Sequence, residues 1–215
     1  MLAHAIEEED WSGLDPADFL AEWKWDGIRV QAVSEGGVQR LYSRTGEDIG
    51  GAFPDVLDTL PAEAVVDGEL LVVRDGEAAS FNELQQRLNR KGVTAKILQD
   101  FPAGIRAYDL LILDGDDLRG RAFVERRGRL ESFIATRKPG RLDLSPLVPF
   151  ATWDELRARR ANPPSPAVEG VMLKRKVSPY LPGRVKGEWW KWKRDPHLVD
   201  AVLMYAQRGH GKRSS

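Results

Sequence analysis

The stretch EWKWDGIR, residues 22–29, places one lysine, Lys24, between two tryptophans and just before an Asp-Gly pair. Lysine is strongly hydrated and usually points into water, so two large aromatic neighbours indicate a lysine whose surroundings are controlled. Apolar residues on both sides of Asp26-Gly27 predict two strands joined by a tight turn, because Asp-Gly is a common hairpin sequence. The stretch therefore predicts a strand that ends near a lysine of unusual environment.

Outward from this stretch, short apolar runs separated by turn residues dominate the chain. Each run has the length and composition of a strand. The predicted strands are residues 19–25, 28–33, 38–42, 65–73, 105–113, 168–173, 188–193 and 199–205.

Three helices are predicted between these strands, two of them because they open with a capping-box sequence, Ser80-Phe-Asn-Glu83 and Thr152-Trp-Asp-Glu155. The predicted helices are residues 81–91, residues 123–137 and a segment from 152 that must end before the prolines at 163 and 164. Strands closed by turns and interrupted by isolated helices predict an α+β fold with mixed, mainly antiparallel sheets flanked by helices.

The composition is that of an ordinary globular chain, with 215 residues of which 42% are hydrophobic and 30% charged, and we expect one main domain. No cysteine is present, which excludes disulfides and thiolate metal sites. The apolar runs fall far short of a membrane span, and the start, MLAHAIEEED, does not resemble a signal peptide. We therefore expect a soluble protein of the cytoplasm, associated with the nucleoid in a bacterium or archaeon, with no membrane partner.

The net charge of −1 is unevenly distributed, because residues 7–10 are all acidic while the last third is basic around Trp189, Trp190 and Trp192. Basic residues interleaved with aromatics can track a phosphate backbone and stack on bases. They can equally form the solvated face of a strand whose tryptophans point inward, and this stretch alone favours that second interpretation.

Strand alternation brings the charged residues of these runs into pairs. Lys191 and Lys193 share one face of their strand, opposite Trp190 and Trp192, and Asp67 and Glu69 share a face of another. Two converging ammonium groups suit a phosphate, and carboxylates from separate strands suit a divalent metal bound to that phosphate. Together these residue types indicate a site that handles nucleotides.

Such a site gives Lys24 a role. A lysine nucleophile must be neutral, and partial burial between aromatics with other cations nearby disfavours the ammonium form. Lysine in this setting could attack the α-phosphate of a nucleotide and form a phosphoramide while pyrophosphate leaves. The alternative, that Lys24 is an exposed strand residue before a hairpin, stays open on this segment alone.

The order and type of these segments closely resemble the nucleotidyltransferase domain of ATP-dependent DNA ligases, in a superfamily that includes RNA ligases and mRNA capping enzymes. The superfamily signature, lysine-x-aspartate-glycine-x-arginine, stands here as residues 24–29. The resemblance implies an ATP-grasp-like fold in which Lys24 becomes adenylated. It also implies that Glu22 and the backbone of Trp23 read the adenine, and that Arg29 lies near the phosphates or ribose.

Further segments resemble later motifs of the same family. The resemblance implies that Arg44 contacts the ribose or the nick phosphate, and that Glu69 holds the ribose and assists the metal. Tyr108 would stack on the purine, where the family often has phenylalanine. Segment 169–174 resembles the motif that contributes a metal-associated glutamate, here Glu169, and it ends at Lys174 in the nucleotide site. Lys191 and Lys193 match the lysines that bind the α-phosphate.

The resemblance covers about residues 2–205, and residues 1–3, 53–54 and 81–85 favour its DNA ligase branch. It implies ATP and Mg²⁺ or Mn²⁺ as cofactors, nicked double-stranded DNA as substrate and a monomer as the working form. The alternatives are an RNA ligase, a capping-type enzyme that uses GTP, and a non-catalytic nucleic-acid-binding module of the same fold.

The expected domain organisation is a nucleotidyltransferase domain over residues 1–197, followed by a linker and the start of an OB-fold domain over 198–215. In the family that domain orients the pyrophosphate, and a helical DNA-binding domain often precedes the nucleotidyltransferase domain. For this chain by itself we therefore expect weak nick sealing and slow self-adenylation.

Overall fold

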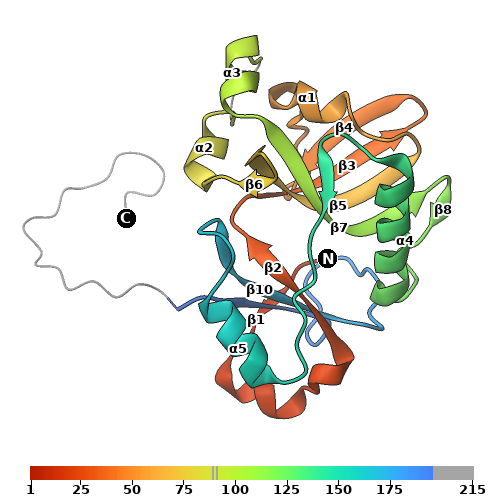
Figure 1. Cartoon of the computed structure of the whole chain (residues 1–215). Coiled ribbons are helices and arrows are strands. Elements are labelled where there is room, and N and C mark those ends of the chain that lie inside the picture. Colours follow the sequence, from red (N-terminus) through yellow and green to blue (C-terminus); the bar gives the residue numbers. More distant parts are fainter. Residues whose placement is uncertain (89, 91, 196–215) are drawn as a thin grey trace, which may run out of the picture.

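The computed structural model describes residues 1–88, 90 and 92–195, which form two β-sheets with helices packed against them (Figure 1). Most strand pairs are antiparallel, and two are parallel, so the α+β prediction of mixed, mainly antiparallel sheets is confirmed. The predicted strand at 199–205 and the predicted OB-fold segment lie outside the described residues. No helix in the described part of the chain is long and apolar enough to cross a membrane.

The smaller sheet brings together the two ends of the described chain. Its strands, in spatial order, are β1 (His4–Ala5), β11 (Trp189–Lys193), β10 (Val168–Arg175) and β2 (Phe19–Trp25). Trp190 is buried with Val171 and Leu173 on one face, and Trp192 packs against the same cluster. This confirms the predicted alternation, because Lys191 and Lys193 line a cavity on the opposite face.

The larger sheet has the central order β4 (Val38–Ser43), β3 (Ile28–Glu35), β5 (Ala64–Arg74), β7 (Ala103–Leu113) and β8 (Asp116–Asp117). Two short strands, β6 (Glu77–Ala78) and β9 (Leu142–Leu144), pair with β5 and β7. Strands β5 and β7 approach closely at Gly68, where an added Cβ would lie 2.3 Å from Ile105 Cγ2. The large core includes Leu70 and Ile105 from these strands.

The prediction of a hairpin at Asp26-Gly27 is wrong, because the two strands that flank this turn, β2 and β3, belong to different sheets. Strand β2 pairs with β10, whereas β3 pairs with β4 and β5. At Gly27 an added Cβ would lie 2.5 Å from the carbonyl oxygen of Leu70, so the chain crosses where only glycine fits against β5. The sharp crossing places Lys24 and Arg29 on separate sheets that face one cavity.

Two of the three predicted helices form as expected. Helix α4 (Phe123–Arg137) ends at Lys138 in the left-handed conformation, and α5 (Trp153–Ala161) begins with the Thr152 hydroxyl accepting from the Glu155 amide. The third is shorter than predicted: α2 spans Phe81–Gln85, and the Ser80 side chain makes no capping bond. The side chain of Glu83 pairs instead with Arg74, 2.5 Å away, and so is drawn out of the predicted capping box.

Several short elements carry no sequence pattern that we recognised. They are α1 (Pro54–Leu57), α3 (Ala95–Asp100) and the 3₁₀ helices η1 (Glu8–Gly13), η2 (Pro16–Asp18) and η3 (Gly50–Ala52). Each spans six residues or fewer, too short for an apolar period to show.

Candidate active site

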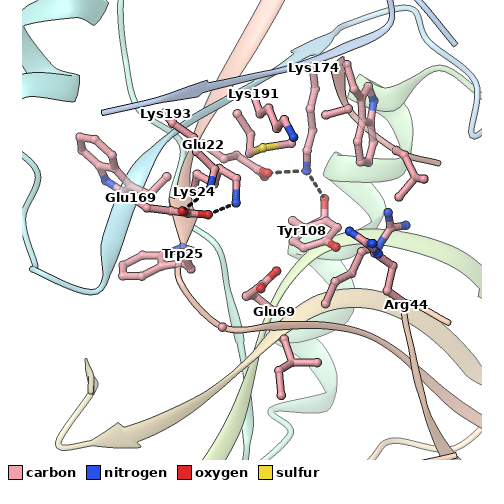
Figure 2. Close-up of a pocket in the computed structure, with 18 of the residues that line it drawn as sticks. Glu22, Lys24, Trp25, Arg44, Glu69, Tyr108, Glu169, Lys174, Lys191 and Lys193 are labelled. Atoms are coloured by element: carbon pink, nitrogen blue, oxygen red, sulfur yellow. Dashed lines mark hydrogen bonds and ion pairs between the residues drawn. The ribbon is translucent and has the colours of Figure 1, made fainter. Parts of the chain in front are cut away.

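A cavity of about 460 Å³ lies between the two sheets and receives side chains from both (Figure 2). Every residue that the sequence predicted for the site lines it: Glu22, Trp23, Lys24, Arg29, Arg44, Glu69, Tyr108, Glu169, Lys174, Lys191 and Lys193. These residues span most of the described chain, and the fold brings them together. Their individual roles remain predictions.

Lys24 sits near the end of β2, where its ammonium forms an ion pair with Glu169 of β10. Glu169 also accepts from Lys193 of β11 at 2.7 Å, so one carboxylate bridges two lysines. Burial raises the pKa of Glu169, but the hydrogen bonds from Lys193 and Lys24 outweigh burial and leave the pKa below its usual range. The carboxylate is therefore held ionised against the predicted nucleophile.

The two tryptophans beside Lys24 line the same cavity as Lys24 and also pack into the core of the domain. The indoles of Trp23 and Trp25 pack into an apolar cluster with Leu71 and Val168. The guanidinium of Arg106 lies 4.2 Å from the centre of the Trp25 ring. The indoles anchor the end of β2, and the Lys24 ammonium finds its charged partner in Glu169.

The cations of the cavity lie close enough to affect one another. The pKa of Lys191 is lowered by partial burial and by the positive charges of Arg184, Lys193 and Lys24. Arg184 lies in the loop before β11 and was not among the predicted site residues. Crowded cations are costly without an anion, so this side of the cavity suits the phosphates of a nucleotide.

Glu69 of β5 faces the same cavity from the larger sheet. Burial raises its pKa to about 8, although the charges of Lys24 and Arg29 act in the opposite direction. No three His, Cys, Asp or Glu side chains within the described ranges cluster as a metal site. Mg²⁺ is commonly held by one or two carboxylates together with water and substrate phosphates, so Glu69 and Glu169 fit such an ion.

Arg29 of β3 is held by partners that the sequence did not reveal. It donates to Asp67 at 2.6 Å, to the hydroxyl of Tyr180 at 2.8 Å and to the carbonyl of Met1. The Tyr180 hydroxyl donates in turn to Asp67, which is fully buried. Asp67 thus serves to orient Arg29, while Glu69, two residues along the strand, remains directed at the cavity.

Glu22 lies at the base of the cavity with two cationic partners. Lys174 of β10 bonds to one carboxylate oxygen and Arg127 of α4 to the other, and all three side chains are almost fully buried. Burial raises the pKa of Glu22, and the two cations act against that rise. The aromatic rings of Tyr108, Trp189 and Phe123 surround the Lys174 ammonium. Arg127 was absent from the sequence prediction.

Arg44 follows β4 and is exposed at the edge of the cavity, where a second, smaller cavity begins. That second cavity is lined by Tyr42 of β4, by Gly46 of the turn that follows and by Tyr180. A cation at this border could contact a group at the outer side of the nucleotide or a nucleic acid that covers the site.

Fold and cavity together are those of a nucleotidyltransferase domain. A family model described as the ATP dependent DNA ligase domain matches residues 1–193, so the chain belongs to this family. The chain is 32% identical to a probable DNA ligase of Koribacter versatilis and to a DNA ligase of Archaeoglobus fulgidus, in both cases over its whole length. It covers only 41% and 39% of those two relatives.

Solved structures agree with this assignment. The ligase domain of Mycobacterium tuberculosis LigD has 28% identity and a TM-score of 0.68, covering 89% of this chain and 58% of that chain. A mycobacterial DNA ligase D complexed with ATP and MES has 30% identity and a TM-score of 0.64, covering 84% of this chain and 56% of that one. A Chlorella virus DNA ligase-adenylate, at 21% identity and a TM-score of 0.65, shares the fold, with coverage of 89% and 67%.

Proposed function

We propose that this chain is the adenylating part of an ATP-dependent DNA ligase, with Lys24 as the residue that takes up the nucleotide. The observation that supports this most is the convergence of Lys24, Lys191 and Lys193 with two carboxylates at one cavity between the sheets. The lysine nitrogen would form a bond to the α-phosphorus as the bond to the pyrophosphate oxygen breaks. The products would be a lysyl-adenylate and pyrophosphate, and the ammonium would first lose its proton to water.

The residues around Lys24 would each have a separate role in the transfer. Lys191 and Lys193 would stabilise the negative charge that develops on the α-phosphate. Glu169 forms an ion pair with the Lys24 ammonium, so it would have to release the amine before attack. A bound Mg²⁺ would offset phosphate charge and activate the leaving pyrophosphate, with Glu69 and Glu169 as its nearest carboxylates.

The whole protein would then act on nicked double-stranded DNA. AMP would pass from Lys24 to the 5′-phosphate of the nick, and the 3′-hydroxyl would displace it. This proposal draws on relatives named DNA ligases that are more than twice as long as the chain, with room for an OB-fold and a DNA-binding domain. We further propose a monomer in the cytoplasm, or at the nucleoid of a bacterium or archaeon.

Intact mass after incubation with ATP and Mg²⁺ tests this proposal. We expect one added adenylyl group that pyrophosphate removes, lost in Lys24→Ala and kept in Lys186→Ala, whose lysine is exposed and outside the cavity. An adduct that persists in Lys24→Ala would overturn Lys24 as nucleophile. If neither protein gains mass, a longer chain that continues past Ser215 distinguishes a binding module from an enzyme that needs its further domain.

Labelling with GTP in place of ATP tests the alternative of a capping-type enzyme. A capping-type enzyme would take up GMP, whereas the proposed ligase would take up AMP. An RNA ligase would also take up AMP, and it would be recognised by sealing nicks in RNA in preference to those in DNA.

A further inference from the structure

Arg127 occupies an unusual place for an arginine of a long helix, because it is almost completely buried and each part of its guanidinium has a partner. One terminal nitrogen donates to Glu22 Oε1 at 2.5 Å, and the other donates to the carbonyl of Ser145 at 2.8 Å. Its Nε donates to Glu131, one turn along the same helix, also at 2.8 Å. The guanidinium is therefore fixed on both sides, and it connects α4 to β2 of the smaller sheet.

The second oxygen of Glu22 is fixed just as firmly. It accepts from Lys174, whose ammonium lies 4.2 Å from the centre of the Tyr108 ring and 4.5 Å from that of Trp189. Figure 2 shows the Lys174 ammonium directed at Glu22 and at the backbone carbonyl of Tyr108. Two charge-assisted bonds from opposite sides leave the carboxylate little freedom to rotate.

If Glu22 reads the base, its ionisation would decide which purine the site accepts. An ionised carboxylate can only accept hydrogen bonds, whereas a protonated carboxyl group can also donate one. Adenine presents a donating amino group on C6, and guanine presents an accepting oxygen there. An ionised Glu22 would bind the amino group and repel the oxygen; a neutral one would tolerate both.

We propose that Arg127 is a positioning residue for purine selection, which holds Glu22 ionised and in one orientation so that the site accepts adenine and rejects guanine. This inference rests on the proposed function, in which Glu22 reads the base. Arg127 does not line the cavity, so it acts only through Glu22. Lys174 also pairs with the Glu22 carboxylate, but its ammonium contacts the rings of Tyr108 and Trp189. A substitution of Lys174 would therefore alter the cavity itself.

Dissociation constants for ATP and GTP test the inference without requiring catalysis. In Arg127→Met we expect the preference for ATP over GTP to fall at least tenfold, because GTP is no longer repelled and ATP loses an oriented acceptor. Arg127→Lys keeps a cation and should restore much of the preference. Arg129→Met removes an arginine from the same helix, one that is exposed and pairs with Asp116, and should leave the preference unchanged.

A general loss of structure would weaken both nucleotides alike, so an unchanged ratio in Arg127→Met would overturn the inference while leaving the proposed function intact. A wild-type chain that binds neither nucleotide would instead contradict the proposed function. A double variant supplies a second measurement. In Glu22→Gln the preference should already be reduced, and adding Arg127→Met should change it no further. A further independent loss in the double variant would show that Arg127 does not act through Glu22.

Discussion

Among the single residues of the cavity, Glu69 has a carboxyl group whose ionised form is destabilised by burial in the folded chain. Its pKa rises from 4.5 to about 8 on folding. Between these two values the folded chain keeps a proton that the unfolded chain releases, so the free energy of unfolding falls as pH rises, by at most about 1.4 kcal/mol per unit. The contribution of the Glu69 carboxyl group to the free energy of unfolding is therefore fully present below pH 4.5 and is lost as pH rises to about 8.

Glu69→Gln removes this dependence. We expect the variant to match the wild type near pH 5 and to exceed it by about 1 kcal/mol or more near pH 9, because glutamine cannot ionise. Urea denaturation of the nucleotide-free chain at both pH values measures the difference. Glu77→Gln, a change at an exposed carboxylate of β6, serves as the control and should show equal effects at both pH values. An equal effect of Glu69→Gln at both pH values would contradict the prediction.

Single residues also show where sequence reasoning succeeds and where it ends. Strand alternation pairs Lys191 with Lys193, and the resemblance to the ligase motifs adds Lys24, Glu69 and Glu169 to the same site. Arg127 could not be found in this way, because its partner Glu22 lies 105 positions away and no sequence pattern near either residue indicates the contact. Tyr180, whose hydroxyl binds Asp67, was missed for the same reason.

At the scale of secondary-structure elements, the pairing of β10 with β11 depends on Gly170. Its φ is +154°, and an added Cβ would lie 2.2 Å from the backbone oxygen of Trp192. Gly170→Ala must separate the two strands, and the adjacent Glu169 would move away from Lys193. We expect a loss of unfolding free energy of about 1–3 kcal/mol and a larger relative loss of adenylation.

Thermal unfolding and adduct formation measure these two effects. Gly128→Ala in helix α4 is the matched control, because an added Cβ there meets open space. Alanine within a helix interior should be neutral or stabilising by roughly 0.5–1 kcal/mol. Wild-type stability in Gly170→Ala would show that the strand pair accommodates a side chain there.

Helix α4 is tied to the larger sheet by a buried ion pair between Arg126 and Asp109 of β7. Both side chains are fully inaccessible to solvent, and Arg126 also donates to the carbonyl of Ser178 at 2.9 Å. Removing one partner leaves the other charge buried alone, which typically costs about 3–5 kcal/mol. We expect a loss of this size for Arg126→Met, measured by urea denaturation.

The exposed pair between Arg129 and Asp116, on the same helix, provides the comparison. Surface pairs contribute about 0–1 kcal/mol, so Arg129→Met should change stability little. Similar losses in the two variants would contradict the assignment of a structural role to the buried pair. The comparison distinguishes the stability that the buried ion pair contributes from the small contribution of a surface ion pair on the same helix.

Elements differ in how well the sequence predicts them. Strands β2, β3, β4, β5, β7, β10 and β11 and helix α4 were predicted nearly residue for residue, because each carries a sustained apolar period or a clear terminator. Helix α2 was predicted too long, and its predicted capping box does not form because Glu83 bonds to Arg74 of β5, a tertiary contact that no local pattern indicates. The hairpin at Asp26-Gly27 failed similarly, since the local turn sequence does not reveal which sheet each strand joins.

Across the described part of the chain, the cavity receives residues from both sheets, so a nucleotide bound there would connect the two halves of the domain. A ligand that binds only the folded state stabilises it, by about 2.7 kcal/mol at a hundredfold excess over its dissociation constant. A covalent adduct differs from a bound ligand because it persists after free nucleotide is removed. The proposed adenylation therefore predicts that a chain once exposed to ATP and Mg²⁺ stays more stable after the free nucleotide is removed.

The unfolding temperature before and after exposure to ATP and Mg²⁺ tests this at the scale of the whole domain. In the wild type we expect the midpoint to rise and to stay high after the free ATP is removed by gel filtration. In Lys24→Ala it should rise with ATP present and return to its starting value after filtration, because that variant can bind the nucleotide but not retain it. Pyrophosphate and Mg²⁺ should then return the filtered wild type to its starting midpoint, since they reverse the formation of the phosphoramide. A filtered Lys24→Ala that stayed stabilised would show that tight binding, rather than a bond to Lys24, holds the nucleotide between the sheets.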